Sequence, residues 1–145
     1  MKRRLLTLVL CALLLLTGCG RNDVARETAL ADHLPDTATK IVLQNCHNGQ
    51  FTFVTDADAM AQITDFLRTV TGSDAESGKG YYEGSYSIVF CQGEETVFSM
   101  AFGDSDCFYM GDYGDGYPIR YLLDGMTVKD DVIPFFSQFD SSIAP

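Results

Sequence analysis

Residues 40–54, KIVLQNCHNGQFTFV, decide the fold, because two largely apolar runs flank a turn signal there. Asn48-Gly49 is a strong hairpin signal, since both positions of a two-residue turn need a positive φ. The flanking runs are rich in β-branched and aromatic residues, which favour strands. They predict a β-hairpin with Asn48-Gly49 as its loop and with Leu43 opposite Val54.

One helix, four strands and a last helix are predicted after the hairpin. Thr55 and Asp58 form a capping-box-like pair, and apolar residues then recur every three or four positions, at Met60, Ile63, Leu67 and Val70. Period-two alternation and the turns around it predict strands over 81–91, 96–102, 107–110 and 117–123. The last helix is predicted over 132–139, where Pro134 falls in the first turn and removes no needed donor.

The predicted elements follow the order β-β-α-β-β-β-β-α. Successive strands joined by short turns favour an antiparallel meander, and the amphipathic helix needs a sheet face on which to bury its apolar stripe. We therefore expect an α+β fold with both helices on one face of the sheet. The length of residues 40–140 suits a single domain with its own core.

The N-terminus has the three-part layout of a secretory signal. Lys2, Arg3 and Arg4 make a basic start, and residues 5–16 form an apolar run that is shorter than the roughly 20 residues a spanning helix needs. Leu16-Thr17-Gly18-Cys19 resembles the lipobox of bacterial lipoproteins in all four positions. The resemblance implies that residues 1–18 are a signal peptide and that Cys19 is lipidated.

Lipidation of Cys19 implies a location for the rest of the chain. Several acyl chains, palmitate among them, anchor a protein durably where one chain does not. We expect a protein held on the cell membrane and facing outside the cytoplasm, with residues 19–39 as lipid anchor and tether. A short helix that includes Leu30 and Leu34 is the alternative for part of this segment.

The charge of the chain excludes one class of partner. The sequence has 10 basic and 20 acidic residues, and loss of residues 1–18 removes three of the basic ones and no acidic one, for a formal net charge of −13. A field of that sign repels nucleic acid. We expect no nucleic-acid binding.

Three segments of the sequence carry a family resemblance. They are Asn48-Gly49 before a strand, Val54-Thr55-Asp56 at the start of a helix, and Tyr82-Glu83-Gly84-Ser85-Tyr86-Ser87-Ile88 before an acidic turn. Together they resemble a family of small bacterial lipoproteins of unknown function. The resemblance covers most of residues 40–139 and implies location and fold, but no catalytic residue. The chain departs from the family pattern because it has no tryptophan.

Three cysteines lie in the predicted domain: Cys46, Cys91 and Cys107. An exported setting permits a disulfide, for which Cys91 with Cys107 is the favoured pair, and three buried thiols are the alternative. Cys46-His47 lacks the second pair of ligands that zinc needs. The aspartates within 104–115 lack the spacing of a calcium loop, so no metal is expected.

Enzymatic activity is not expected either. A Cys/His nucleophile needs a base held beside the thiol, but His33 falls in the tether and His47 in a turn. We predict a protein that is not an enzyme and has no cofactor.

All seven tyrosines fall within residues 81–121, interleaved with aspartates. Tyrosine offers rigid contact area with a polar tip and is enriched where proteins meet partners. The alternative is that some of these rings fill the sheet core while the carboxylates solubilise turns. The predicted binding surface comprises Tyr82, Tyr86, Tyr109, Tyr113, Tyr117, Asp112 and Asp115.

Two functions remain open from the sequence. The first is a binding module for a basic secreted protein, a cationic peptide or a glycan, because aromatic faces beside carboxylates suit such ligands. The second is a structural or accessory subunit of a cell-envelope complex, which the lipid would simply position.

Overall fold

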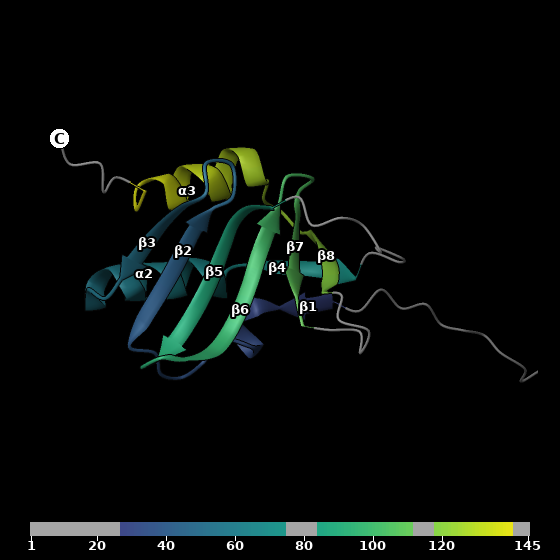
Figure 1. The fold of residues 1–145 in the computed structure, drawn as a ribbon. Helices are drawn as coiled ribbons and strands as arrows, with labels where there is room; N and C mark the ends of the chain where they lie inside the picture. The colour runs from purple at the N-terminus through teal and green to yellow at the C-terminus, as the bar shows by residue number, and fades with distance from the viewer. Residues whose placement is uncertain (1–26, 75–83, 112–117, 141–145) are drawn as a thin grey trace, which may run out of the picture.

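The computed structural model describes residues 27–74, 84–111 and 118–140. Their strands form one eight-stranded antiparallel sheet in the order β1-β4-β8-β7-β6-β5-β2-β3 (Figure 1). The strands are β1 (Glu27–Ala29), β2 (Lys40–Asn45), β3 (Gln50–Val54), β4 (Thr71–Asp74), β5 (Gly84–Gln92), β6 (Glu95–Gly103), β7 (Cys107–Met110) and β8 (Ile119–Leu123). The helical elements are a 3-10 turn (Leu30–Asp32), α2 (Ala57–Arg68), a π-helical turn (Val128–Val132) and α3 (Ile133–Ser137).

The predicted α+β meander is wrong. The described chain is a mostly-β domain, one eight-stranded sheet with two short α-helices. The predicted order lacks β1 and β4, which pair with each other and extend the sheet beyond β8. Nor is the sheet a simple meander, because β2 attaches beside β5, with β3 outside it.

Part of the predicted tether belongs to the folded unit. β1 lies at one edge of the sheet, and the next residue, Leu30, is fully buried. The Leu30 N–H donates to the Val70 carbonyl at 3.0 Å. Thr39 Oγ1 accepts a hydrogen bond from the Gly93 N–H at 2.8 Å. The fold therefore includes residues from Glu27 onward, ahead of the predicted boundary at Lys40.

β2 and β3 form a hairpin in a different register from the predicted one. Asn45 lies opposite Gln50 and Leu43 opposite Thr52, so the loop is longer than Asn48-Gly49. Gly49 still adopts a positive φ of 71°, which a side chain would disfavour. The register differs by two residues, so each side chain keeps the face that the alternation predicts.

α2 begins just after β3, and Asp56 is its N-cap. The Asp56 carboxylate accepts a hydrogen bond from the Ala59 N–H at 2.9 Å, the role expected of Thr55. Ile63 and Leu67 are fully buried, as the spacing predicts. The exposed side of the helix carries charge, including the Arg68–Asp65 ion pair at 2.9 Å.

The C-terminal helical segment begins earlier than residue 132. The π-helical turn precedes α3, and its N-cap is Thr127, whose hydroxyl accepts a hydrogen bond from the Asp130 N–H at 3.1 Å. Asp131 accepts one from the Thr127 N–H at 2.7 Å. The Val128 N–H donates to the Asp106 carboxylate at 2.7 Å, which ties this turn to the loop before β7.

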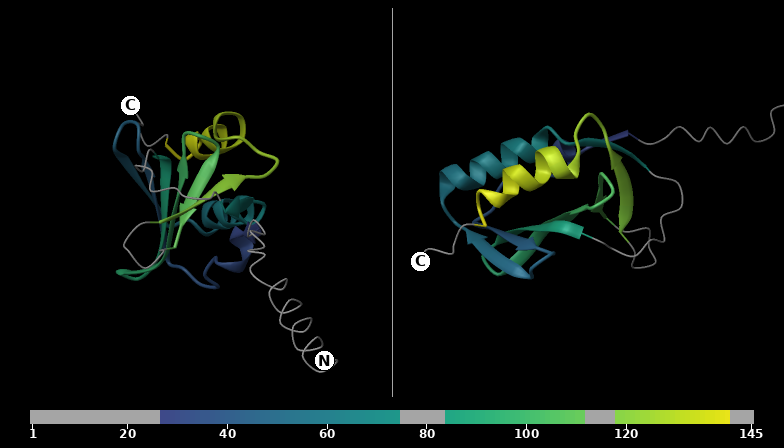
Figure 2. Two further views of the ribbon diagram at one scale, coloured as in Figure 1. Left: turned by 90° about the vertical axis from the view of Figure 1, so that its right-hand side faces the viewer. Right: turned by 90° about the horizontal axis from the view of Figure 1, so that it is seen from above.

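α2 and α3 lie side by side on the same face of the sheet (Figure 2), where the rings of Phe66 and Phe135 stack at 4.0 Å. Beneath them, Phe136 is fully buried, with ring centroids 5.4 Å from Tyr86 and 5.9 Å from Phe102. The core therefore fills the space between this face and the two helices. Every helix in the described ranges is too short or too polar to cross a membrane.

Candidate functional site

The face of the sheet opposite α2 and α3 is here called the helix-free face (Figure 2). The strand register shows which residues lie on it. Residues directly opposite each other in antiparallel strands share a face. One row runs from β3 to β8 as Phe51, Gln44, Ser87, Ala101, Tyr109 and Arg120. The next row begins Phe53, Val42, Val89 and Ser99. The residues that alternate with these rows along the strands point to the other face, and among them Leu43 and Ile88 are fully buried in the core beneath the helices.

An apolar patch occupies the β3 side of the helix-free face. Phe51 is 54% exposed and Phe53 is 66% exposed. The patch is completed by Val42, Val89 and Val97, of which Val97 is exposed and the other two are half-buried. An antiparallel sheet with one solvated face is expected to be polar on that face. Contiguous exposed apolar side chains of this kind mark interaction surfaces.

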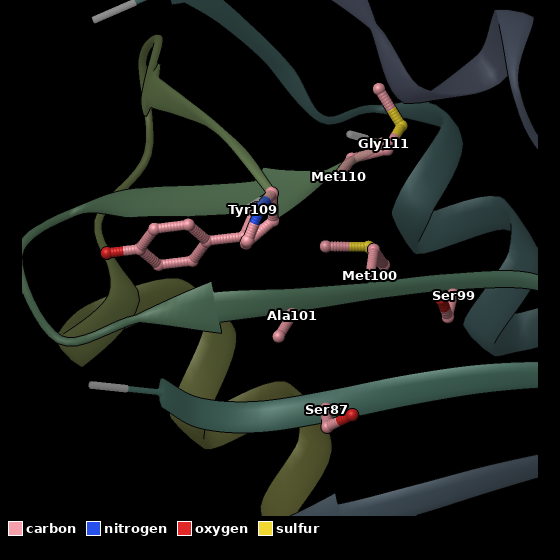
Figure 3. A pocket seen from close by; sticks show the side chains of 8 residues that line it. Ser87, Ser99, Met100, Ala101, Tyr109, Met110 and Gly111 are labelled. Atoms are coloured by element: carbon pink, nitrogen blue, oxygen red, sulfur yellow. The ribbon is translucent and has the colours of Figure 1, made fainter. Parts of the chain in front are cut away.

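A pocket of about 150 Å³ opens on the middle of the sheet (Figure 3). Ser87, Ser99 and Ala101 line it with small side chains, and the ring of Tyr109 lies beside them. Pockets for drug-sized ligands and cofactors are several hundred Å³. This one has room for a single side chain of a partner, and it adjoins the apolar patch because Ser99 follows Val89 in the same cross-strand row.

The predicted tyrosine surface is not brought together among the described residues. Tyr86 and Tyr109 are both buried, and they lie on opposite faces of the sheet. Tyr86 belongs to the core under α3, whereas Tyr109 lines the pocket. The remaining members lie outside the described residues, namely Tyr82, Asp112, Tyr113, Asp115 and Tyr117.

Phe51 and Phe53 belong to the apolar patch but not to the binding surface predicted from the sequence. A signal for them was present in QFTFV, because apolar side chains there fall on both faces of a strand. Val54 covers the core side, so the two phenylalanines must lie on the other face. Whether that second face is covered depends on segments distant in sequence, and pattern alone does not reveal it.

Tyr86, Asn45 and Asp140 form a hydrogen-bonded cluster at the end of α3. The Tyr86 hydroxyl donates to the Asp140 carboxylate at 2.5 Å, and Asn45 Nδ2 donates to the same carboxylate oxygen at 3.0 Å. Burial, and next the hydrogen bond to Asp140, raise the pKa of Tyr86 far above 10. The neutral hydroxyl is thus fixed as a donor, and the cluster holds the chain end against the sheet.

The favoured disulfide does not form in this fold. Cys46, Cys91 and Cys107 are free thiols. Cys91 lies opposite Thr96 at the start of β6, whereas Cys107 lies opposite Gly103 at the end of that strand. Thr96 and Gly103 are seven residue steps apart along the strand, which corresponds to about 23 Å. Cysteines can be bridged only when their Cα atoms are within about 7 Å.

The other polar groups near the turns have structural partners. His47 Nε2 lies 3.3 Å from Asp104 Oδ1, and both side chains are largely exposed. Burial, together with the charge of Asp104, raises the pKa of the nearby Cys46 thiol, which disfavours a reactive thiolate. In the described part of the chain, no group of three or more histidine, cysteine or carboxylate side chains is placed to hold a metal.

Comparison with known proteins assigns the chain to no family. The chain matches no family model and no curated protein. It is similar to a solved structure of a Clostridium perfringens protein described as a lipoprotein, with 15% identity and a TM-score of 0.48 over 69% of this chain and 82% of that one. A likeness at this level establishes neither a shared family nor a shared function.

Proposed function

We propose that the chain is a lipid-anchored extracytoplasmic binding module without enzymatic activity, attached to the membrane through Cys19. The support for export and lipidation is the signal-like N-terminus and its lipobox-like end, residues that lie outside the described ranges. The anchor places the domain at the membrane surface. The support for the binding role is the exposed surface of the sheet.

The apolar patch is the observation that carries the binding role. Exposing the rings of Phe51 and Phe53 to water is unfavourable, by about 25 cal/mol for each Å² of apolar surface. A partner that covers them recovers this free energy. The neighbouring pocket, lined by Ser87, Ser99 and Ala101, gives such a partner a place to insert one side chain. Aromatic anchors beside a small pocket are typical of interface centres.

Charge favours a basic partner. The chain carries 10 more acidic than basic residues, so its field attracts cationic proteins and peptides and accelerates their association. We therefore assign as ligand a basic secreted protein or a cationic peptide. A glycan, the other ligand class considered from the sequence, would use aromatic faces but gains nothing from the acidic field.

A pair of matched variants tests this assignment. Ser99→Lys puts a long side chain into the pocket, and Gln62→Lys makes the same change of charge on the exposed back of α2. Against a lysozyme and a lysine-rich peptide as probes, we expect Ser99→Lys to raise the Kd about tenfold, as loss of a central contact does. Gln62→Lys should alter it by less than about twofold, because remote surface charges act weakly.

Two results would overturn the proposal. One is equal affinity of the two variants, which would mean that only net charge matters. The other is no binding of either cationic probe at low salt. Stable co-purification with one envelope protein at high salt would instead favour the accessory-subunit role, because a screened interaction must be held by apolar contact.

A further inference from the structure

β3 is an edge strand that lacks the usual protection. It ends the described sheet, so one side of its backbone has no strand beside it (Figure 1). Natural edge strands are commonly blocked by charged residues, proline or a bulge. Gln50–Val54 contains no charge and no proline, and its pairing with β2 is regular along its whole length. The opposite edge, β1, has only three residues and carries Glu27.

The sequence of β3 is complementary to itself. Phe51-Thr52-Phe53 reads the same in both directions, so an antiparallel pairing centred on Thr52 places Phe51 opposite Phe53 of a second copy. Directly opposite side chains are about 4.5–5.5 Å apart, and aromatic pairs at that distance stabilise a sheet. The four rings would lie on the helix-free face, where each copy alone leaves them exposed.

Thr52 lies at the centre of that pairing and, within the described ranges, has a side-chain oxygen without a partner. Its Oγ1 is a buried side-chain oxygen with no hydrogen-bond partner among the described residues. A buried polar atom without a partner is unfavourable. In the pairing, Thr52 faces Thr52 of the second copy on the core side, a position from which threonine pairs hydrogen-bond across strands.

Charge does not oppose this register locally. The paired residues Gln50–Val54 carry no charged side chain in either copy, so no two like charges meet along the edge. The chains as wholes are both acidic and repel each other at long range. Added salt should therefore strengthen this contact, whereas it weakens the binding of a cationic partner.

We propose that two copies of this chain associate through their β3 edges, antiparallel and with the twofold axis at Thr52, to make one continuous sheet. The contact is isologous, so it closes as a dimer and does not propagate. The contact shares the rings of Phe51 and Phe53 with the apolar patch of the proposed binding function, but it does not use the pocket between β5 and β7. The pocket variant Ser99→Lys therefore tests the binding function separately from the dimer.

Cysteine cross-linking in cells tests the register. Thr52→Cys is close in size to threonine and places two thiols opposite each other across the axis, within bridging distance. Gln50→Cys is the matched control, because the two thiols would be offset by four residues along the strands, about 13 Å. Under mild oxidation before extraction, we expect a disulfide-linked homodimer for Thr52→Cys. Gln50→Cys and the unmodified chain should stay monomeric on a non-reducing gel.

A charge exchange provides a test that leaves the core intact, since the two rings are exposed. Phe51→Glu with Phe53→Glu, and separately Phe51→Lys with Phe53→Lys, should each give a monomer in sedimentation equilibrium of the full chain. A mixture of the two should restore the dimer, because each glutamate would face a lysine. A linked dimer from Gln50→Cys but not Thr52→Cys, or sedimentation of the unmodified chain as a monomer at both low and moderate salt, would overturn the proposal.

Discussion

Tyr86 connects the core to the C-terminal end of the described chain. Its ring packs against Phe136, and its hydroxyl donates to Asp140, whose carboxylate also accepts from Asn45. A hydrogen bond to a charged group contributes more than one between neutral groups. One side chain thus joins β5, β2 and the residues after α3.

Removing this hydroxyl should lower stability. Tyr86→Phe keeps the ring but leaves Asp140 with one donor fewer, so we expect the free energy of unfolding to fall by about 1–2 kcal/mol. Urea denaturation of the purified chain at neutral pH measures this. Phe98→Leu changes a half-buried ring on β6. This control tests whether loss of stability is specific to the Tyr86 hydroxyl or follows from any substitution of an aromatic residue. A Tyr86→Phe chain as stable as the unmodified one would show that the cluster contributes nothing.

The Tyr86 hydroxyl should also make the free energy of unfolding decrease at alkaline pH. The pKa of Tyr86 is raised in the fold, first by burial and then by Asp140, from its ordinary value of 10.0. Above that pH the unfolded chain loses the proton while the folded chain keeps it, so stability is fully present below pH 10 and falls as pH rises further, by up to about 1.4 kcal/mol per unit. Tyr86→Phe should make this decline shallower. Parallel curves for both chains between pH 9 and 11 would assign the decline to other groups.

At the scale of elements, β4 shows how packing overrides local pattern. A Cβ built on Gly72 would lie 2.6 Å from the Leu122 carbonyl oxygen and 2.6 Å from a ring carbon of Phe108. The absence of a side chain lets β4 pair with β8 directly over the Phe108 ring. The strand exists because of this close approach and not because of strand propensity.

Gly72→Ala should therefore destabilise the sheet. The added methyl group must displace backbone or a buried ring, which costs about 1–3 kcal/mol. Ser73→Ala, one residue along the same strand and half-buried, should change stability by less than about 0.5 kcal/mol. Thermal unfolding of the three chains makes the comparison. Equal midpoints for Gly72→Ala and Ser73→Ala would mean that the strand moves to accept the methyl group.

The strands that the sequence predicts are those whose own residues carry the pattern. β2, β3 and β5 to β8 have apolar or aromatic alternation, and each lies where the alternation indicates. β1 and β4 have none, and they pair only because distant segments are brought beside them. The tyrosine surface could not be judged from spacing, because the faces of Tyr86 and Tyr109 depend on the register across the two turns between β5 and β7. That register places the two side chains on opposite faces of the sheet.

At the scale of the whole molecule, the early start of the fold shortens the tether. Seven residues separate Cys19 from Glu27, the first residue of β1. A fully extended chain covers at most about 3.6 Å per residue, so an anchor at Cys19 would hold β1 within about 30 Å of the lipid. β1, the strand closest to the anchor in sequence, is the edge of the sheet farthest from β3. β3, at the other end of the sheet, would be left accessible to a partner.

Replacement of the proposed anchor tests this arrangement. Cys19→Ala removes the only thiol that the lipobox-like sequence presents for acylation, so the chain should leave the membrane fraction and lose all labelling by radioactive palmitate. Cys46→Ala is the matched control, because it removes a domain thiol and should change neither membrane partition nor labelling. The purified Cys19→Ala chain should unfold at the same urea concentration as the unmodified one, since Cys19 precedes the first strand of the described sheet in the sequence. Persistent labelling of Cys19→Ala would place the acyl chains elsewhere. Persistent membrane binding without label would mean that the chain is held by an uncut signal peptide or by a protein partner, and the size of the chain on a gel separates these two.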